Sequence, residues 1–286
     1  MKGNLNTKFW LQKLELEEFP EPEHIPLRHP VILCHGYGAL ASLVKPSPLY
    51  DTAILMRSHG ILAYAPNIVP YARIEVRASE WERLIDQLIR KEGFERINVV
   101  AHSMAGLDIR YALSKLELGR QVVSLTTVAT PHRGTSLAEL ALKAPEGVRK
   151  KIAAFLDWMG DLIYPETSSD AAGPVKQLTR EYILENFNPE IRDVEGVTYY
   201  SFSAAAGKGT DHPIPTLQRY QNNYIYREEG LNDGFVSVES ARWGGHVSTT
   251  HLSHLEQMHL QVGEDREKIY RAFWSDLARH LAEKGH

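Results

Sequence analysis

The sequence predicts an α/β fold with a mostly parallel central sheet flanked by helices. Short, wholly apolar runs recur along the chain and alternate with segments of helical periodicity. Such runs suit strands that are covered on both faces, and their alternation with helices is typical of a parallel sheet. At 286 residues the chain can bury a large core without covalent cross-links. Its single cysteine, Cys34, excludes an intrachain disulfide.

The charge balance and the hydropathy exclude several classes of partner. The chain has 32 Lys and Arg against 36 Asp and Glu, a formal net charge of −4 with no long run of one sign, so we expect no nucleic-acid interface. No stretch of 18 apolar residues occurs, so no transmembrane segment is expected. The first residues lack the apolar core of a secretory signal, which leaves a cytoplasmic protein or a mature secreted form open. The oligomeric state cannot be predicted from these features.

The amino-terminal part leads into the first strands. Residues 1–28 are polar and carry three prolines in their second half, and they are predicted to form an arm. The first predicted strand, Val31–Cys34, ends at the glycine-punctuated turn His35–Gly38. A second candidate strand covers Ile61–Ala65 and stops at Pro66.

A long amphipathic helix is expected before the next strand. Ser79 and Glu82 have the spacing of a capping box, apolar residues then recur at helical intervals, and Gly93 ends the pattern. Two further strands are predicted over Ile97–Val100 and Gln121–Thr130, with a helix between them. This order is that of a strand–helix–strand unit with parallel strands.

Residues 135–194 interrupt the alternation and contribute no obvious strand. They divide the predicted core into residues 29–134 and 195–286, and the sheet resumes at Val197–Phe202. Apolar residues at helical spacing form one stripe over residues 152–163. We expect the insert to be a helical lid or cap over the sheet. The alternative is that the stripe packs permanently on the core.

Ser103 is the candidate nucleophile. It follows the apolar run Ile97–Val100 and precedes a predicted helix, which is the place of the nucleophile in a strand–turn–helix elbow. Such an elbow needs small residues two positions before and two positions after the nucleophile, and here Ala101 and Ala105 stand where glycine is usual. The alternative is that Ser103 only caps the following helix, because serine is a favoured N-cap residue.

A serine nucleophile needs a histidine to remove its proton and a carboxylate to orient that histidine. In this architecture the acid follows the serine along the chain and the histidine comes last. Asp233, in a turn expected to follow a sheet strand, is the candidate acid, although an ordinary Asx turn is the simpler alternative. His251 is the candidate base, and its local rivals are His246, His254 and His259.

The tetrahedral transition state of acyl transfer needs donors for its negative oxygen. The backbone N–H groups of Met104, directly after the nucleophile, and of Tyr37, in the loop after the first strand, are predicted to form this oxyanion hole. His35 is expected to hold that loop rather than to act as an acid or base. His102 is expected to be a buried, hydrogen-bonded neighbour of the nucleophile.

Four segments carry these motifs along the chain, namely Val31–Gly36, Ala101–Tyr111, Ser124–Gly134 and Leu231–Val236. Together they resemble the bacterial true lipases typified by the triacylglycerol lipases of Pseudomonas and Burkholderia. The likeness covers roughly residues 29–262 and is more specific than a serine elbow alone. It implies an α/β-hydrolase fold with a helical lid, and hydrolysis of long-chain carboxylic esters at a lipid surface.

The resemblance also implies roles at matching positions. Ser103 would be the nucleophile and Asp233 the acid. His251 would be the base, because the family's histidine is followed by leucine and, six residues later, by glutamine. Leu252 and Gln257 match that frame.

The family's structural calcium site uses an aspartate two residues after the histidine, where this chain has Ser253. Asp211 and the Gln257 carbonyl are the remaining candidate ligands. A single carboxylate is a poor cage for a divalent cation, which usually takes several oxygen ligands. We therefore expect no required cofactor or metal, with a structural calcium ion as the open alternative.

The predicted function is hydrolysis of lipid carboxylic esters by a serine hydrolase that works through an acyl-enzyme. Its partner would be a lipid or ester substrate, met at a lipid–water interface. An acyltransferase, a thioesterase or an amidase would use the same three residues. A non-catalytic lipid-binding protein on a hydrolase scaffold is an alternative of a different class, and the presence of every triad and oxyanion position argues against it.

Overall fold

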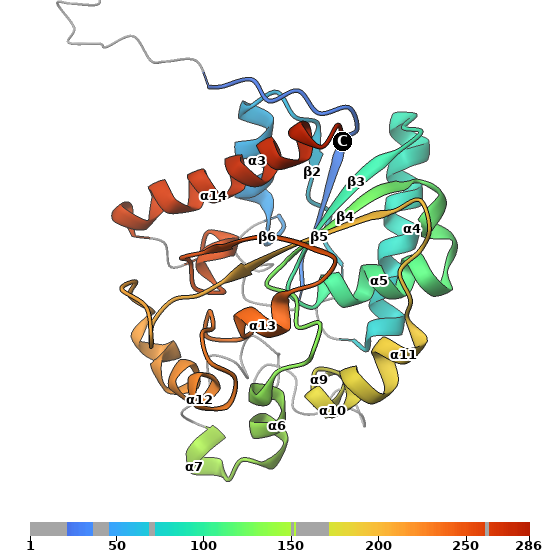
Figure 1. Ribbon diagram of the computed structural model, residues 1–286. Helices are drawn as coiled ribbons and strands as arrows, with labels where there is room; N and C mark the ends of the chain where they lie inside the picture. The colour runs from blue at the N-terminus through green and yellow to red at the C-terminus, as the bar shows by residue number, and fades with distance from the viewer. Residues whose placement is uncertain (1–21, 37–45, 69–71, 150–151, 153–171, 261–262) are drawn as a thin grey trace, which may run out of the picture.

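A six-stranded parallel sheet forms the centre of the protein (Figure 1). The computed structural model describes residues 22–36, 46–68, 72–149, 152, 172–260 and 263–286. The strands lie in the order β2-β1-β3-β4-β5-β6, and each neighbouring pair is parallel. This confirms the predicted α/β class. The strands are β1 (Val31–Cys34), β2 (Ala63–Tyr64), β3 (Ile97–His102), β4 (Val122–Val128), β5 (Thr198–Ala204) and β6 (Gly245–Thr250).

Helices cover both faces of the sheet. Ile32 and Cys34 of β1 join one buried core cluster, whereas the alternating Val31 and Leu33 join a second one. Successive side chains of a strand point to opposite faces, so a strand buried on both faces is apolar along its whole length. The first cluster includes residues of α4 (Ile74–Glu92) and α5 (Ala105–Lys115), and the second includes residues of α3 (Tyr50–Ser58) and α14 (Glu264–Glu283).

The long helix α4 starts earlier than the sequence predicts. It begins at Ile74 rather than at a capping box, and the Ser79 hydroxyl lies inside the helix, where it donates to the Glu75 carbonyl at 3.0 Å. The Ile74 N–H instead donates to the Gln177 side chain at 2.8 Å, so a distant residue satisfies this helix end. The predicted end is confirmed, because Gly93 is the C-cap residue with φ of 73°.

The element that precedes Asp233 in the chain differs from the predicted one. It follows a helix, α12 (Arg219–Glu229), and not a strand of the sheet. A local antiparallel bridge between Asn232 and Ser237 closes the turn, and Ser237 then caps α13 (Val238–Ala241) by accepting from the Ser240 N–H at 3.1 Å. A local bridge therefore closes the Asp233 turn, and the Thr135 hydroxyl, 100 residues earlier, also donates to the Phe235 carbonyl at 2.7 Å.

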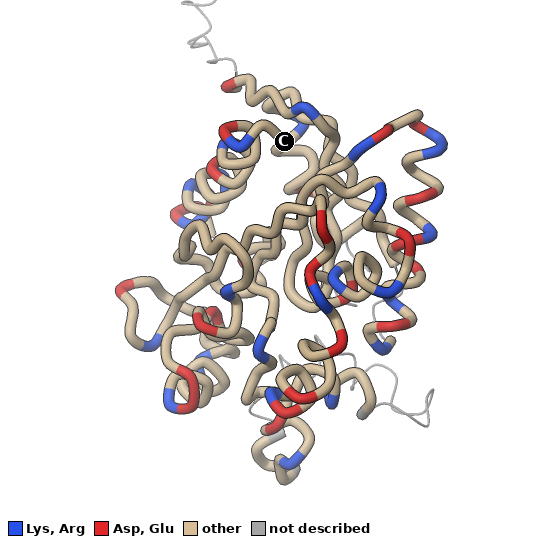
Figure 2. The backbone as a smooth tube through the Cα atoms, turned by 45° about the vertical axis from the view of Figure 1, so that its right-hand side comes forward, with Lys and Arg blue, Asp and Glu red and all other residues tan. Residues whose placement is uncertain are grey.

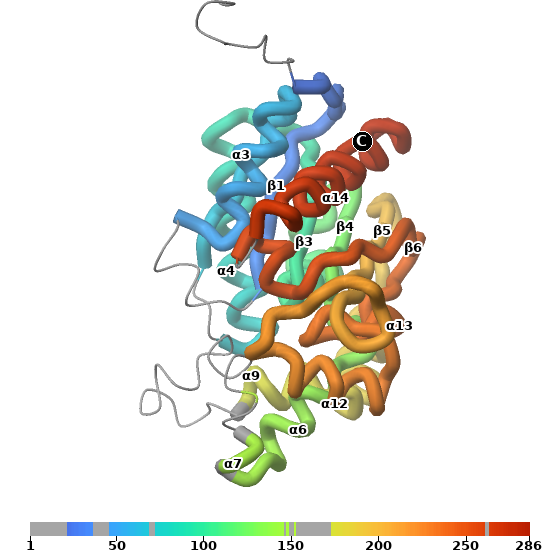
Figure 3. The backbone as a smooth tube through the Cα atoms, turned by 90° about the vertical axis from the view of Figure 1, so that its left-hand side faces the viewer, coloured from blue at the N-terminus to red at the C-terminus, as the bar shows by residue number. Residues whose placement is uncertain are grey.

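The part of residues 135–194 that the structure describes is helical. Its helices lie beyond the carboxyl ends of the strands, at the lower end of Figures 1 and 3. Ile152 is buried in the core cluster, while residues 153–163 of the apolar stripe lie outside the described residues, so the lid stays a prediction. The helices are α6 (Ser136–Lys143), α7 (Glu146–Arg149), α9 (Ala172–Lys176), α10 (Arg180–Tyr182), the π-helical turn η3 (Ile183–Phe187) and α11 (Asn188–Glu190).

The end of the predicted arm packs on the fold. Ile25 is buried and its N–H donates to the His59 carbonyl at 2.9 Å, and Arg28 N–H donates to the carboxy-terminal His286 at 2.6 Å. Basic and acidic residues are interspersed along the backbone in the view of Figure 2. None of the described helices combines the length and apolar character that a membrane span requires.

Candidate active site

Ser103 occupies a sharp turn between β3 and α5. Its φ of 59° is unusual for a residue with a side chain, and such a backbone costs about 1–3 kcal/mol unless its surroundings impose it. Three hydrogen bonds fix the turn. The Ser103 N–H donates to Val128 at 2.8 Å, and its carbonyl accepts from the Thr130 hydroxyl at 2.7 Å and from the Gly106 N–H at 3.1 Å. The helix-cap alternative is wrong, because the N-cap residue of α5 is Met104.

The positions near this turn that have no room for a methyl group are Gly106 and Gly36, and not the motif positions Ala101 and Ala105. A methyl group at Gly106 would lie 2.2 Å from the Thr130 hydroxyl oxygen, and one at Gly36 would lie 2.8 Å from the Ser103 Cβ. Ala101 and Ala105, by contrast, are fully buried with their methyl groups accommodated. The alanines therefore do not prevent the elbow from forming.

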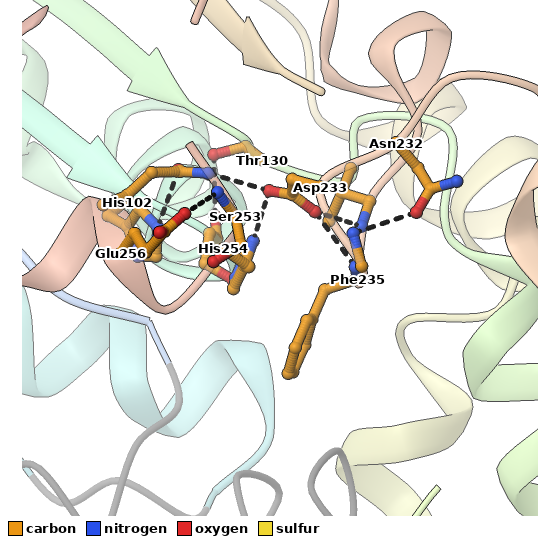
Figure 4. A network of polar contacts seen from close by, with 12 residues as sticks. His102, Thr130, Asn232, Asp233, Phe235, Ser253, His254 and Glu256 are labelled. Carbon is orange, nitrogen blue, oxygen red and sulfur yellow. Dashed lines mark hydrogen bonds and ion pairs between the residues drawn. The ribbon is translucent and has the colours of Figure 1, made fainter. Parts of the chain in front are cut away.

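Asp233 lies fully buried opposite this turn (Figure 4). Its Oδ1 atom accepts the backbone N–H groups of Phe235 at 3.0 Å and Val236 at 2.9 Å, which is the predicted Asx-type turn. Its Oδ2 atom accepts from His254 Nδ1 at 2.7 Å and from Gln257 Nε2 at 3.0 Å. The turn and the triad geometry are thus compatible, because each uses a different carboxylate oxygen.

His254, and not His251, joins the acid to the serine. Since the carboxylate of Asp233 can only accept, His254 Nδ1 donates to it, and Nε2 is left to accept from the Ser103 hydroxyl at 2.8 Å. The prediction of His251 is wrong. That residue is exposed and its ring stacks on His212 with centroids 4.1 Å apart.

The place of β6 in the sheet explains this correction. β6 is an edge strand, and Ser103 follows β3, three strands away. Three strand spacings amount to about 14 Å, which a side chain directly after β6 does not span. The chain has to return across the sheet first, and the His254 N–H donates to the Asp233 carbonyl at 2.9 Å where it does so. A signal was present in the sequence, since histidine followed by leucine occurs at both 251 and 254 and only His254 has an acidic residue, Glu256, two positions later.

The other rival histidines lie elsewhere. His246 Nε2 is 3.0 Å from the Ser203 hydroxyl on β5. His259 lies between two carboxylates, with Nδ1 2.8 Å from Asp51 and Nε2 2.6 Å from Glu267. Both residues therefore serve structural contacts.

Gln257 is a further side chain of the site, which the sequence marked only as a motif position with its carbonyl as a candidate calcium ligand. Its amide bridges two residues: Nε2 donates to Asp233, and Oε1 accepts from His102 Nε2 at 3.1 Å. The His102 ring lies 4.7 Å from that of His254. Burial, and next the charge of a protonated His254, hold the pKa of His102 well below its usual range, so His102 stays neutral. The expectation that His102 is a buried, hydrogen-bonded neighbour is confirmed.

The loop after β1 is held from inside the protein. His35 Nδ1 donates to the Gly36 carbonyl at 2.8 Å, and its Nε2 accepts from the Ile68 N–H at 3.3 Å. Arg77 donates to the His35 carbonyl at 3.0 Å and pairs with the buried Asp108 at 2.8 Å. Burial, followed by the Arg77 charge, lowers the pKa of His35 to about 4, so its ring stays neutral while these contacts hold the loop.

One of the two predicted oxyanion donors can be located. Met104 is fully buried directly after the nucleophile, and its N–H has no hydrogen-bond acceptor within the described part of the chain. An N–H group without an acceptor can donate to the negative oxygen that develops in the transition state. Tyr37, the second predicted donor, lies outside the described residues.

The candidate calcium ligands do not form a cation site. Asp211 is exposed, and the Gln257 carbonyl accepts from the Trp274 indole N–H at 3.1 Å. Ser253 offers one buried hydroxyl and no charge. Throughout the described ranges, no group of three or more His, Cys, Asp or Glu side chains is placed to hold a metal ion. These residues therefore do not fit a calcium ion.

Comparison with known proteins places this geometry in context. No protein-family model matches the sequence. A triacylglycerol lipase of Pseudarthrobacter phenanthrenivorans is 30% identical, over 82% of this chain and 90% of that protein. A triacylglycerol lipase of Burkholderia plantarii is also 30% identical, over 82% of this chain and 80% of that protein. The mature lipase BlEst2 of Bacillus licheniformis shares the fold, with a TM-score of 0.63 at 18% identity over 90% of this chain and 96% of that one.

Proposed function

The chain belongs to the family of bacterial triacylglycerol lipases, and from this premise we propose that it hydrolyses lipid esters with Ser103, His254 and Asp233 as its triad. Carboxylic ester hydrolysis follows from the family and from its α/β-hydrolase fold. The residue roles are our proposal, and they rest on the contacts within the site.

The proposed reaction begins with attack of the Ser103 Oγ atom on the ester carbonyl carbon. His254 Nε2 accepts the hydroxyl proton as the Oγ–C bond forms, and Asp233 stabilises the imidazolium through Nδ1. The Met104 N–H, with the Tyr37 N–H as its proposed partner, donates to the oxyanion. His254 then gives the proton to the leaving alcohol. Water, activated by the same imidazole, releases the carboxylic acid and restores the serine.

The observation that supports these roles best is the unbroken hydrogen-bond path from Asp233 through His254 to Ser103. The side chains of His254 and Asp233 are fully buried, and Ser103 is 1% exposed. In such a low-dielectric setting a carboxylate–imidazole pair orients the base strongly. A protein that only binds lipid has no need of this path, so the non-catalytic alternative loses support. Acyl transfer to an acceptor other than water is supported by no feature of the described residues.

We further propose that residues 135–194 cap this site. The described helices of the insert lie beyond the carboxyl ends of the strands, which is the end of the sheet where Ser103 turns (Figure 1). In open α/β sheets, ligands bind at the carboxyl ends of the strands. A lipid ester that enters there would meet the insert as well as the core.

A series of p-nitrophenyl esters tests the proposal. We expect release of p-nitrophenol by the wild-type protein and a fall of at least about 10⁴-fold in kcat for Ser103→Ala. Ser79→Ala, a serine on the exposed side of α4, is the matched control and should leave kcat unchanged. Retained hydrolysis in Ser103→Ala would overturn the proposal, and ester formation that exceeds hydrolysis when an alcohol is added would support the acyltransferase instead.

A further inference from the structure

An ion pair connects the His254 loop to the last helix of the protein. Glu256, two residues after His254, pairs with Arg266 in the first turn of α14. Arg266 Nε donates to Glu256 Oε1 at 2.8 Å and Nη2 donates to Oε2 at 2.9 Å, so the contact is bidentate. The side chains are only 11% and 5% exposed. A bidentate pair that is shielded from water is stronger and more directional than a surface pair.

The same two residues hold the loop before His254 as well. Arg266 Nη2 also donates to the His251 carbonyl, and Glu256 Oε2 accepts the Ser253 N–H at 2.7 Å. One guanidinium and one carboxylate therefore fasten the backbone at two points, the His251 carbonyl and the Ser253 N–H, and their own ion pair ties Glu256 to α14. Ser253 and Glu256 lie on either side of His254 along the chain, and Figure 4 shows all three together.

Arg266 stands at a position that its own helix does not favour. The amino-terminal end of a helix carries a partial positive charge, so a cation in the first turn is unfavourable. The neighbouring Glu264, Asp265 and Glu267 follow the usual rule of acidic residues there. A residue that breaks a local rule is expected to have a tertiary role. The contacts of Arg266 with Glu256 and His251 supply that role.

We infer that Arg266 is a positioning residue for the proposed base His254 and serves as a built-in cation of the loop. Its guanidinium neutralises the Glu256 carboxylate and holds the His251 carbonyl, and these three oxygens are fewer than the roughly six to eight that a calcium ion takes in proteins. Here the positive charge is part of the chain, so the loop needs no metal. This inference rests on the proposed role of His254 as the base. If His254 is the base, the position of its loop matters, because a displacement of about 1 Å at a catalytic group can cost about 10²-fold in rate.

The test compares Arg266→Met, Arg266→Lys and the control Arg271→Met. Arg271 lies on the same helix and pairs with Glu267 at 2.8 Å, but it is 62% exposed and does not touch the loop. We expect Arg266→Met to lower kcat by about 10- to 100-fold with little change in KM. Arg266→Lys keeps the positive charge but cannot make the bidentate contact, so its kcat should lie between those of Arg266→Met and the wild type. The control should match the wild type.

Hydrogen–deuterium exchange separates this inference from the proposed function. Peptides that cover residues 251–260 should exchange faster in Arg266→Met, while peptides from β3 and α5 keep the wild-type rate. A wild-type protein without any esterase activity would refute the proposed function, and the exchange data would still decide whether Arg266 holds the loop. Wild-type exchange over 251–260 in Arg266→Met would overturn the inference. If that variant does not fold, Arg266→Lys replaces it, and exchange over 251–260 that is no faster than in the wild type would overturn the inference.

Addition of EDTA and of calcium provides the second arm. We expect kcat and the exchange of residues 251–260 to stay the same in wild-type protein with 1 mM of either, roughly the range that fills weak extracellular calcium sites. A fall in kcat or faster exchange with EDTA would mean that a metal holds the loop, which would overturn the inference. Glu256→Gln combined with Arg266→Met should be no worse than the more damaged single variant, because residues of one pair are not additive.

Discussion

Gln257 donates to the same carboxylate oxygen of Asp233 that His254 binds. The oxygen thus has a second partner that does not move when the imidazole takes or gives a proton. The opposite end of the amide is fixed by His102, whose low pKa keeps it a neutral donor. The orientation of Asp233 is therefore set before the histidine is charged.

The first prediction concerns this amide. Gln257→Leu removes a hydrogen bond to a charged group and leaves the Nε2 donor of His102 buried without a partner, each a cost of about 1–3 kcal/mol. We expect kcat to fall about 10-fold with KM little changed, because the Asp233 carboxylate is less well oriented while the substrate pocket is unchanged. Steady-state kinetics on a soluble ester measures this. A wild-type kcat in the leucine variant would show that Asp233 is held well enough by the Phe235 and Val236 N–H groups.

The second prediction concerns the crowding beneath the nucleophile. Gly106→Ala would place a methyl group 2.2 Å from the Thr130 hydroxyl oxygen, which itself holds the Ser103 carbonyl. We expect a loss of about 1–3 kcal/mol in the free energy of unfolding, as for other overpacked cores, measured with urea. Gly147→Ala is the control, because no atom lies within 4 Å of the added methyl group. Equal stability of the two variants would contradict the packing described for the elbow.

The third prediction concerns acid. Burial holds the pKa of His35 at about 4 and keeps those of His102 and His132 well below the ordinary value of 6.5. The unfolded chain therefore binds more protons than the folded one between pH 6.5 and 4, and stability falls as pH decreases through that window. The buried Asp108, with its pKa raised to about 6, acts in the opposite direction, but it is one group against three.

His35→Gln isolates one part of this effect. The variant cannot titrate, so its stability should fall less steeply between pH 6.5 and 4 than that of the wild type, by about 3 kcal/mol over the window for a fully buried histidine. Urea unfolding at several pH values gives the two slopes. Parallel slopes would mean that His35 is protonated in the folded protein, contrary to its contact with the Ile68 N–H.

Local patterns in the sequence were sufficient to predict the central strands and the elbow. The apolar runs at β1 and β3 are buried along their whole length, so their composition carries the information. The place of Ser103 follows equally from a strand, a turn and a helix that are adjacent in the chain. These predictions needed no knowledge of contacts between distant segments.

The remaining features depend on contacts between distant segments. The N–H at the start of α4 is bound by Gln177, 103 residues later in the chain. The residues around Ser79 give no indication of that contact. The choice between His251 and His254 depends on how far β6 lies from β3, which is a property of the strand order. The histidine–leucine motif fits the sequence at both 251 and 254, so the motif alone contains no information on that distance.

The rate at which a fluorophosphonate labels Ser103 is the sharpest test of the proposed triad. Labelling needs only the nucleophile and its base, so it is independent of the natural substrate. We predict that His254→Ala lowers the labelling rate constant by at least about 10³-fold, whereas His251→Ala labels within about twofold of the wild type. Intact mass spectrometry counts the adduct and peptide mapping locates it. Slow labelling of His251→Ala together with fast labelling of His254→Ala would contradict the role of His254 as the base.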